Sequence, residues 1–237
     1  IIKTKRYKDG TLEVIDEGRG IPLDYNEIED RYNWELVYCE LYAGGKYNNE
    51  DGENYEFSLG LNGLGACATQ YASEFFDVKV IRDGFEYELH FEKGENVGGL
   101  KKTPTNSKKT GTYQRWRPDP EVFTETQIPQ SYFIEVLKQQ AVVNAGVTFT
   151  FEDELTDESF EFCYPDGIKG YVEEINADRG ITEVIYRKTE GEGRDRADRP
   201  DYKVKVEMAF AFNNESPRQE YYHNSSYLEY GGSPDRA

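Results

Sequence analysis

An acidic residue followed by closely spaced glycines is the part of this sequence best suited to bind a small molecule. Residues 16–22 read DEGRGIP and directly follow TLEVI, a run that predicts a β-strand. The carboxylate of Asp16 at a strand end can accept a hydrogen bond from an exocyclic amine. Gly18 and Gly20 lack the Cβ that would keep a flat base away from the backbone. The block therefore predicts an adenine-binding site, although by itself it could also be an ordinary turn.

Two further blocks follow in order along the chain. Residues 60–65 read GLNGLG ahead of a predicted helix, and Thr110-Gly111-Thr112 lies on a predicted strand. Glycines before a helix let backbone N–H groups approach an anion, and the helix N-terminus adds partial positive charge. The ordered trio favours a nucleotide site over three unrelated turns. Residues 63–68 also match the G-x-G-x-x-A pattern of dinucleotide folds, but a loop precedes them instead of the required buried strand.

Other kinds of catalytic site find little support in the sequence. His90 and His223 are isolated from each other, and there is no serine nucleophile elbow or zinc-protease helix motif. The cysteines at 39, 67 and 163 are widely spaced, which argues against a disulfide framework or a zinc site. No run is apolar enough for a membrane span, so we expect a cytoplasmic protein that has no membrane partner.

The charge of the chain is strongly negative. It carries 28 Lys+Arg against 46 Asp+Glu, a formal net charge of −18. So acidic a surface repels phosphate backbones and anionic lipids, and any DNA contact is expected to come from other domains. Aromatic residues make up 14% of the chain, which predicts a folded protein despite the charge.

Alternation, turn residues and helical spacing predict an α+β protein with antiparallel strands. A hairpin is predicted for residues 2–7 and 12–15. Further strands are predicted at 75–82, 85–92, 110–117, 147–151 and 159–163. Helices are predicted at 33–43, 65–73, 129–144 and 168–177.

The glycine-rich residues 44–65 predict a lid-like loop between two of these helices. Beyond residue 180 the sequence changes to long strands, predicted at 182–187, 203–212 and 220–227 around a charged loop at 190–200. This change predicts a first domain at 1–179 and the beginning of a second at 180–237. Because residue 1 is Ile within a predicted strand, we interpret the sequence as part of a longer chain.

The ordered blocks resemble the ATPase domain in the B subunit of DNA gyrase and of related bacterial type II topoisomerases, within the GHKL ATPase superfamily. Residues 43–47, AGGKY, resemble the start of the family's lid, and residues 60–65 resemble its phosphate loop. Residues 110–112 resemble the family's Thr-Gly-Thr strand, and residues 117–119 resemble the Pro-Asp that ends it. Residues 167–177 resemble the helix that closes the domain. The resemblance implies a two-layer GHKL (Bergerat) sandwich of mixed sheet and helices, followed by the start of a ribosomal-S5-like transducer domain.

The resemblance also implies roles for individual residues. Asp16 would bind the adenine amine, directly and through water, with Thr112 supporting it from the neighbouring strand. The remaining implied nucleotide-binding residues fall into a block with Asp16 (Gly18, Gly20), a pocket lining (Val14, Ile21, Val37), a rim where aminocoumarin-type inhibitors bind (Arg19, Pro22, Arg82), and a phosphate-binding group (Lys46, Asn62, Gly63, Leu64, Gly65).

For the whole protein, the resemblance implies ATP and Mg²⁺ as cofactors. It also implies a partner of the gyrase A-type or topoisomerase IV A-type, and a homodimer that closes on ATP binding to drive DNA strand passage. The family's catalytic Glu and magnesium-binding Asn lie on a helix upstream of the first hairpin, so no catalytic or metal-binding residue is assigned here. We therefore expect the 237-residue chain to hydrolyse ATP poorly or not at all.

Several positions depart from the family pattern. Asn62 stands where most bacterial gyrases have His, and Glu56 where a second lid lysine is common. Residues 49–54 lengthen the lid, and Ser233-Pro234 replaces Thr-His. These departures leave open the register of the lid and the choice between gyrase and topoisomerase IV. The alternatives are a non-catalytic, acidic, β-rich binding module for a ligand or protein, or another GHKL ATPase.

Overall fold

The computed structural model describes residues 1–43, 64–194, 197–198, 201–215 and 217–232. By their contacts these residues group into two units, one of residues 1–137 with 148–162 and the other of residues 138–147 with 163–237. The domain boundary near residue 180 stays a prediction, because grouping by contacts does not define domains.

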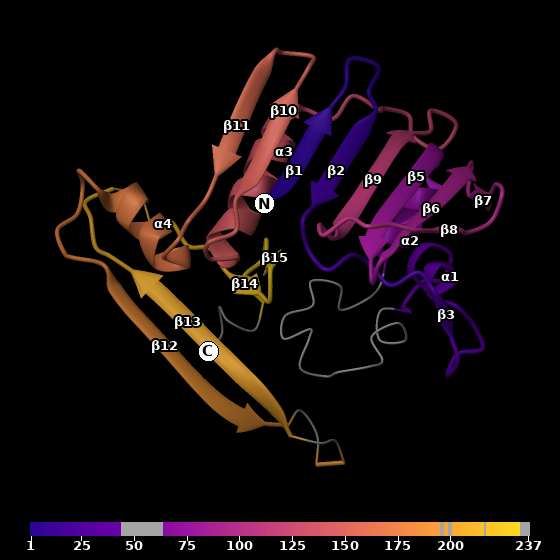
Figure 1. Ribbon diagram of the computed structural model, residues 1–237. Helices are drawn as coiled ribbons and strands as arrows, with labels where there is room; N and C mark the ends of the chain where they lie inside the picture. The colour runs from indigo at the N-terminus through magenta and orange to yellow at the C-terminus, as the bar shows by residue number, and fades with distance from the viewer. Residues whose placement is uncertain (44–63, 195–196, 199–200, 216, 233–237) are drawn as a thin grey trace. The chain divides into compact units, whose positions relative to one another are not determined.

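The first unit is built on a nine-stranded mixed sheet (Figure 1). Its order is β11-β10-β1-β2-β9-β5-β6-β7, with β8 paired to β6. β1 and β10 are parallel, and the other neighbours are antiparallel. The strands are β1 (Ile2–Arg6), β2 (Leu12–Asp16), β5 (Ser73–Arg82), β6 (Phe85–Glu92), β7 (Glu95–Asn96), β8 (Lys101–Pro104), β9 (Gly111–Pro118), β10 (Phe149–Asp153) and β11 (Glu158–Phe162). The predicted α+β class is confirmed.

The predicted N-terminal hairpin is confirmed, and its register positions the first block. Asp9 accepts a hydrogen bond from the Thr11 N–H at 2.9 Å, and Gly10 adopts a φ of +81°. This closes the turn between β1 and β2. β9 then pairs with the other side of β2, with Asp16 directly opposite Thr112. The first and third sequence blocks therefore meet where the neighbouring inner strands β2 and β9 end and begin.

The core lies on one face of this sheet. Alternate residues of β5 (Phe76, Val78, Val80) and of β6 (Tyr87, Leu89, Phe91) are buried there, as expected for strands whose side chains alternate between faces. Leu23, Val37 and Tyr38 complete the cluster. Two helices contribute to it, α1 (Asn33–Tyr38) through Val37 and Tyr38 and α2 (Gly65–Tyr71) through Ala66.

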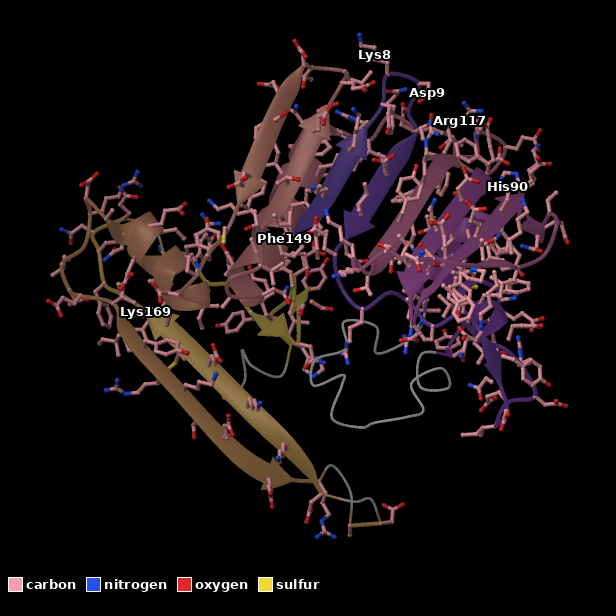
Figure 2. The ribbon with its side chains drawn as sticks, viewed as in Figure 1. Lys8, Asp9, His90, Arg117, Phe149 and Lys169 are labelled. Atoms are coloured by element: carbon pink, nitrogen blue, oxygen red, sulfur yellow. The ribbon has the colours of Figure 1, made fainter. Side chains whose placement is uncertain are left out.

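The opposite face of β5 and β6 is lined with charged pairs. Lys79 Nζ lies 2.6 Å from Glu86, and His90 Nδ1 lies 2.6 Å from Asp77 (Figure 2). The Asp77 carboxylate, together with Glu92, raises the pKa of His90 above its ordinary value despite partial desolvation. His90 therefore has a structural role in an ion-pair ladder, which agrees with its isolation in the sequence.

Three predicted elements differ from the structure. The strand predicted at 182–187 is β12 (Ile185–Gly193), which extends into the charged loop predicted at 190–200. The helix predicted at 33–43 ends at Tyr38. Tyr42 adopts a left-handed φ of +64°, which cannot continue a right-handed helix, and Leu41 is half exposed. The strand predicted at 220–227 is a two-residue hairpin of β14 (Tyr222–His223) and β15 (Ser226–Tyr227), reversed at Asn224 with φ +54°. The short pair β3 (Tyr25–Asn26) and β4 (Arg31–Tyr32) was not predicted.

The second unit combines helices with a long hairpin. Helix α3 (Gln130–Val143) begins in the first unit and ends in the second, and α4 (Gly167–Asn176) follows. β12 (Ile185–Gly193) and β13 (Tyr202–Phe210) pair antiparallel. Near α4, Glu220 accepts hydrogen bonds from Tyr171 at 2.9 Å and Tyr222 at 2.8 Å. In the described ranges, no helix has the length and apolar character needed to cross a bilayer.

Candidate functional site

The turn after β2 holds the Asp16 carboxylate in a defined orientation. Its Oδ1 accepts a hydrogen bond from the Gly18 N–H at 2.7 Å. A Cβ on Gly18 would lie 2.8 Å from the same oxygen, closer than real Cβ contacts, so only glycine fits without a shift. The second oxygen, Oδ2, has no hydrogen-bond partner among the described residues and remains able to accept from a ligand.

Gly111 and Thr112 of β9 lie against this turn. Thr112 is buried opposite Asp16, and its Oγ1 accepts a hydrogen bond from the Ile21 N–H at 3.2 Å. A Cβ on Gly111 would overlap the Asp16 carbonyl oxygen and lie 3.3 Å from Glu17 Cα. Gly111 therefore lets β9 and the turn approach more closely than any other residue type allows.

Gly20 makes a second close approach, to β5. Its φ is +82°, and an added Cβ would lie 2.8 Å from Val80 Cγ1 and 3.0 Å from the Ile81 carbonyl oxygen. Arg82 Nη1 donates to the Gly20 carbonyl oxygen at 3.1 Å, and Arg82 Nε donates to Asp83 at 2.8 Å. Arg82, predicted at the rim of the pocket, thus holds the backbone of the turn.

A hydroxyl that the sequence did not single out also reaches the turn. Thr110 Oγ1 donates to the Gly18 carbonyl oxygen at 2.6 Å. The available signal was the repeated Thr of Thr110-Gly111-Thr112, of which only Thr112 was assigned a role. Both threonines of the motif contact the turn, on either side of Gly111.

The predicted apolar residues fall into two groups. Val37 is buried in the core cluster that also contains Val80, and Ile21 packs against that cluster. Val14 lies on β2 two residues before Asp16, so both side chains point to the same face of the sheet. Pro22 is half-buried after Ile21. Their role as the lining of a pocket beside the Asp16 turn stays a prediction.

The predicted phosphate-binding residues are described only in part. Leu64 and Gly65 stand at the start of α2, and the next residue, Ala66, packs against the same core cluster as Ile21. Lys46, Asn62 and Gly63 lie outside the described residues, as do Glu56 and the predicted lid. Arg19 is exposed within the turn itself.

The residues near the turn fit an adenine better than they fit a metal ion. A fixed carboxylate oxygen and glycine backbone offer an acceptor and a flat wall to an aminopurine. Within the described ranges, no three His, Cys, Asp or Glu side chains are grouped so as to hold a metal ion.

The cysteines of the first unit are poor nucleophiles. Burial, followed by the neighbouring Cys67, raises the pKa of the Cys39 thiol to about 11, and burial also raises the pKa of Cys67. A thiol is reactive as its thiolate, which these shifts disfavour near neutral pH. We therefore assign no nucleophilic role to these cysteines, and the candidate site is defined by its hydrogen bonds.

The second unit contains a separate, open hollow of about 720 Å³. It is lined by residues of α4 and the segment after it, including Lys169, Glu173 and Asn176 (Lys169 is labelled in Figure 2). None of its lining residues belongs to the Asp16 turn. We assign the candidate site to the turn because the close backbone approaches and oriented hydrogen bonds occur there.

Comparison with known proteins points to one group. No protein-family model matches the chain. The B subunit of DNA topoisomerase 4 from Salmonella typhimurium is 40% identical over 169 residues, which cover 71% of this chain and 26% of that protein. The B subunit of DNA gyrase from Thermotoga maritima is 33% identical over 219 residues, 90% of this chain and 33% of that protein. The chain thus spans only a quarter to a third of these relatives.

Solved structures agree in fold. The 43K ATPase domain of Thermus thermophilus gyrase B, solved in complex with an aminocoumarin, matches 95% of this chain and 55% of that chain, with a TM-score of 0.70 and 24% identity. The topoisomerase IV ATP-binding domain of Francisella tularensis matches 70% of this chain and 76% of that chain, with a TM-score of 0.57. The chain is a homologue of the B subunits of DNA gyrase and topoisomerase IV, and it has the mixed-sheet fold of the GHKL ATPase domain of gyrase B.

Proposed function

We propose that this chain binds ATP, with the adenine amine donating to Asp16 Oδ2. The observation that carries the proposal is the turn at 16–21, in which the Gly18 N–H at 2.7 Å orients the carboxylate and leaves one oxygen for a ligand. Gly20 and Gly111 keep the backbone beside it free of Cβ atoms. Such a preformed acceptor favours a base with an exocyclic amine over one with an oxygen at that position.

The remaining nucleotide contacts are proposed from the family pattern. Val14, Ile21 and Val37 would line the base pocket, and Arg19, Pro22 and Arg82 would form its rim, where an aminocoumarin is also proposed to bind. Backbone amides at 63–65, with Lys46 and Asn62, would hold the phosphates. Mg²⁺ would neutralise phosphate charge when bound with the nucleotide.

The test of the proposal is the affinity of Asp16→Asn for ATP. In this variant the amide oxygen would still accept from the Gly18 N–H, and the amide nitrogen would face the adenine amine, so that two donors oppose each other. We expect a loss of about ten- to a hundredfold in affinity, measured by isothermal titration calorimetry.

Glu17→Gln is the matched control, because Glu17 is the adjacent carboxylate and its partner is the exposed Lys3 at 3.9 Å. It should bind ATP as the unchanged chain does. Equal affinities of Asp16→Asn and the unchanged chain for ATP would contradict the assignment of Asp16 as the acceptor of the adenine amine. They would also favour the alternative of a non-catalytic binding module.

Hydrolysis is a separate question from binding. The family resemblance gives the roles of general base and magnesium ligand to residues on a helix ahead of the first hairpin. We expect the 237-residue polypeptide, assayed by itself, to bind ATP with little or no steady-state phosphate release. Turnover at the rate of a full-length relative, measured by a coupled phosphate assay, would contradict this expectation.

For the whole protein, the proposed function is that of the B subunit of a type II DNA topoisomerase. ATP binding would join two copies into a homodimer that closes around DNA, and an A-type subunit would be the partner. The net charge of −18 supports DNA contact through domains other than this one. Localisation in the cytoplasm is proposed from the similarity to subunits of DNA gyrase and DNA topoisomerase 4 and from the widely spaced cysteines.

A further inference from the structure

Gly18 is held at both of its backbone polar groups. Its N–H donates to Asp16 Oδ1 at 2.7 Å, and its carbonyl oxygen accepts from Thr110 Oγ1 at 2.6 Å. Thr110 precedes β9 and lies 92 positions away along the sequence. One hydroxyl from a neighbouring element thus fixes the residue that orients the carboxylate.

The hydrogen bond from Thr110 restricts the backbone more at Gly18 than it would at another residue type. Glycine has the widest choice of backbone conformations, and this turn is exposed, so water competes for its peptide groups. With the carbonyl oxygen fixed by Thr110, rotation of the adjoining peptide planes is restricted. The N–H that holds Asp16 Oδ1 then keeps its direction, and Oδ2 keeps its direction toward the proposed ligand.

Two other hydrogen bonds to the turn act at its far end. Thr112 accepts from the Ile21 N–H, and Arg82 donates to the Gly20 carbonyl oxygen. Neither reaches Gly18 or the carboxylate. The Thr110 hydroxyl is therefore a side-chain donor that fixes the half of the turn carrying Asp16.

We propose that Thr110 is a positioning residue for recognition of the base. Through Gly18 it holds Asp16 in the orientation that accepts a 6-amino group, and it thereby selects 6-amino over 6-oxo purine nucleotides. The inference rests on the proposed function, in which Asp16 binds the adenine amine.

The experiment compares ATP with inosine triphosphate, which has an oxygen in place of the amino group. Thr110→Val keeps the shape of the side chain but removes the donor, and Thr110→Ser restores the hydroxyl. We expect Thr110→Val to bind ATP about three- to tenfold more weakly while its affinity for inosine triphosphate stays unchanged. Thr110→Ser should recover the selectivity of the unchanged chain.

Ser107→Ala is the matched control. Ser107 lies in the same loop, and its hydroxyl donates to the Lys109 carbonyl oxygen at 3.0 Å without touching the turn. Circular dichroism and thermal unfolding would establish that each variant is folded. Should Thr110→Val not fold, Thr110→Ala against Thr110→Ser makes the same comparison.

The outcomes separate the two hypotheses. The positioning role is overturned if Thr110→Val keeps the ATP selectivity of the unchanged chain, or if its affinities for ATP and inosine triphosphate fall equally. It is also overturned if Thr110→Ser does not recover the selectivity. If the unchanged chain does not prefer ATP over inosine triphosphate, the assignment of Asp16 itself fails, and the inference fails with it.

Discussion

Replacing Asp153 by Asn is expected to lower the free energy of unfolding by about 3–5 kcal/mol. Asp153 is fully buried, and its partner Arg6 has a side-chain exposure of 7%. Arg6 Nε donates to Asp153 Oδ1 at 2.9 Å, and Arg6 Nη2 donates to Oδ2. Gln130 of α3 and the Leu155 N–H also donate to this carboxylate, at 3.0 Å and 3.1 Å.

The large effect follows from the charge that would remain. Arg6 and Asp153 are register partners on the parallel strands β1 and β10, so neither can swing into solvent without disturbing the sheet. With Asn at position 153, the guanidinium stays buried without a counter-charge, and that is the costly state. Equilibrium urea unfolding of the two proteins would measure the difference.

A double variant provides the control. Arg6→Met with Asp153→Leu removes both charges and should recover most of the stability that Asp153→Asn loses, because no unpaired charge is left. A loss below about 1 kcal/mol for Asp153→Asn would contradict the importance of the pair.

The same pair predicts the direction of the pH dependence. Burial alone would raise the pKa of the Asp153 carboxyl, but the hydrogen bonds from Arg6 and the Leu155 N–H outweigh it and hold the pKa below its ordinary value. A carboxyl with a lowered pKa in the folded state stabilises the protein above its ordinary pKa of about 4, and this is lost as pH falls through the folded-state value. The stability difference between the two proteins should therefore shrink in acid.

Replacing Gly111 by Ala is expected to weaken ATP binding by more than about tenfold and to destabilise the fold by about 2 kcal/mol. Its φ is +152°, and the new Cβ would overlap the Asp16 carbonyl oxygen. Both contacting groups are backbone, which cannot rotate aside as a side chain can. The start of β9 must move away from the turn, and Thr110 and Thr112 move with it.

Gly98→Ala is a control that separates the effect of a positive φ from the effect of displacing β9. Gly98 also has a positive φ, +87°, but a Cβ there would meet nothing within 4 Å. This control should show a modest loss of stability and unchanged ATP affinity in the same calorimetric and urea measurements. If Gly111→Ala behaved like Gly98→Ala, the close approach of β9 to the turn would have no part in nucleotide binding.

The sequence by itself determined the features that depend on neighbouring residues. The hairpin of 2–7 and 12–15 and the strands at 75–82 and 85–92 were predicted, because turn chemistry and side-chain period are local properties. The three ordered blocks also identified the family. The helix predicted at 33–43 and the strand predicted at 220–227 were wrong in extent, because tertiary packing sets where such elements end.

Only the tertiary structure decided which contacts hold the turn of the candidate site in place. Thr110 and Arg82 reach the turn from 92 and 62 positions away, because β9 lies between β2 and β5 in the sheet. Arg6 meets Asp153 across 147 positions for a similar reason. Strand order and register follow from burying one face of the whole sheet together, which is a collective property that no local pattern in the chain contains.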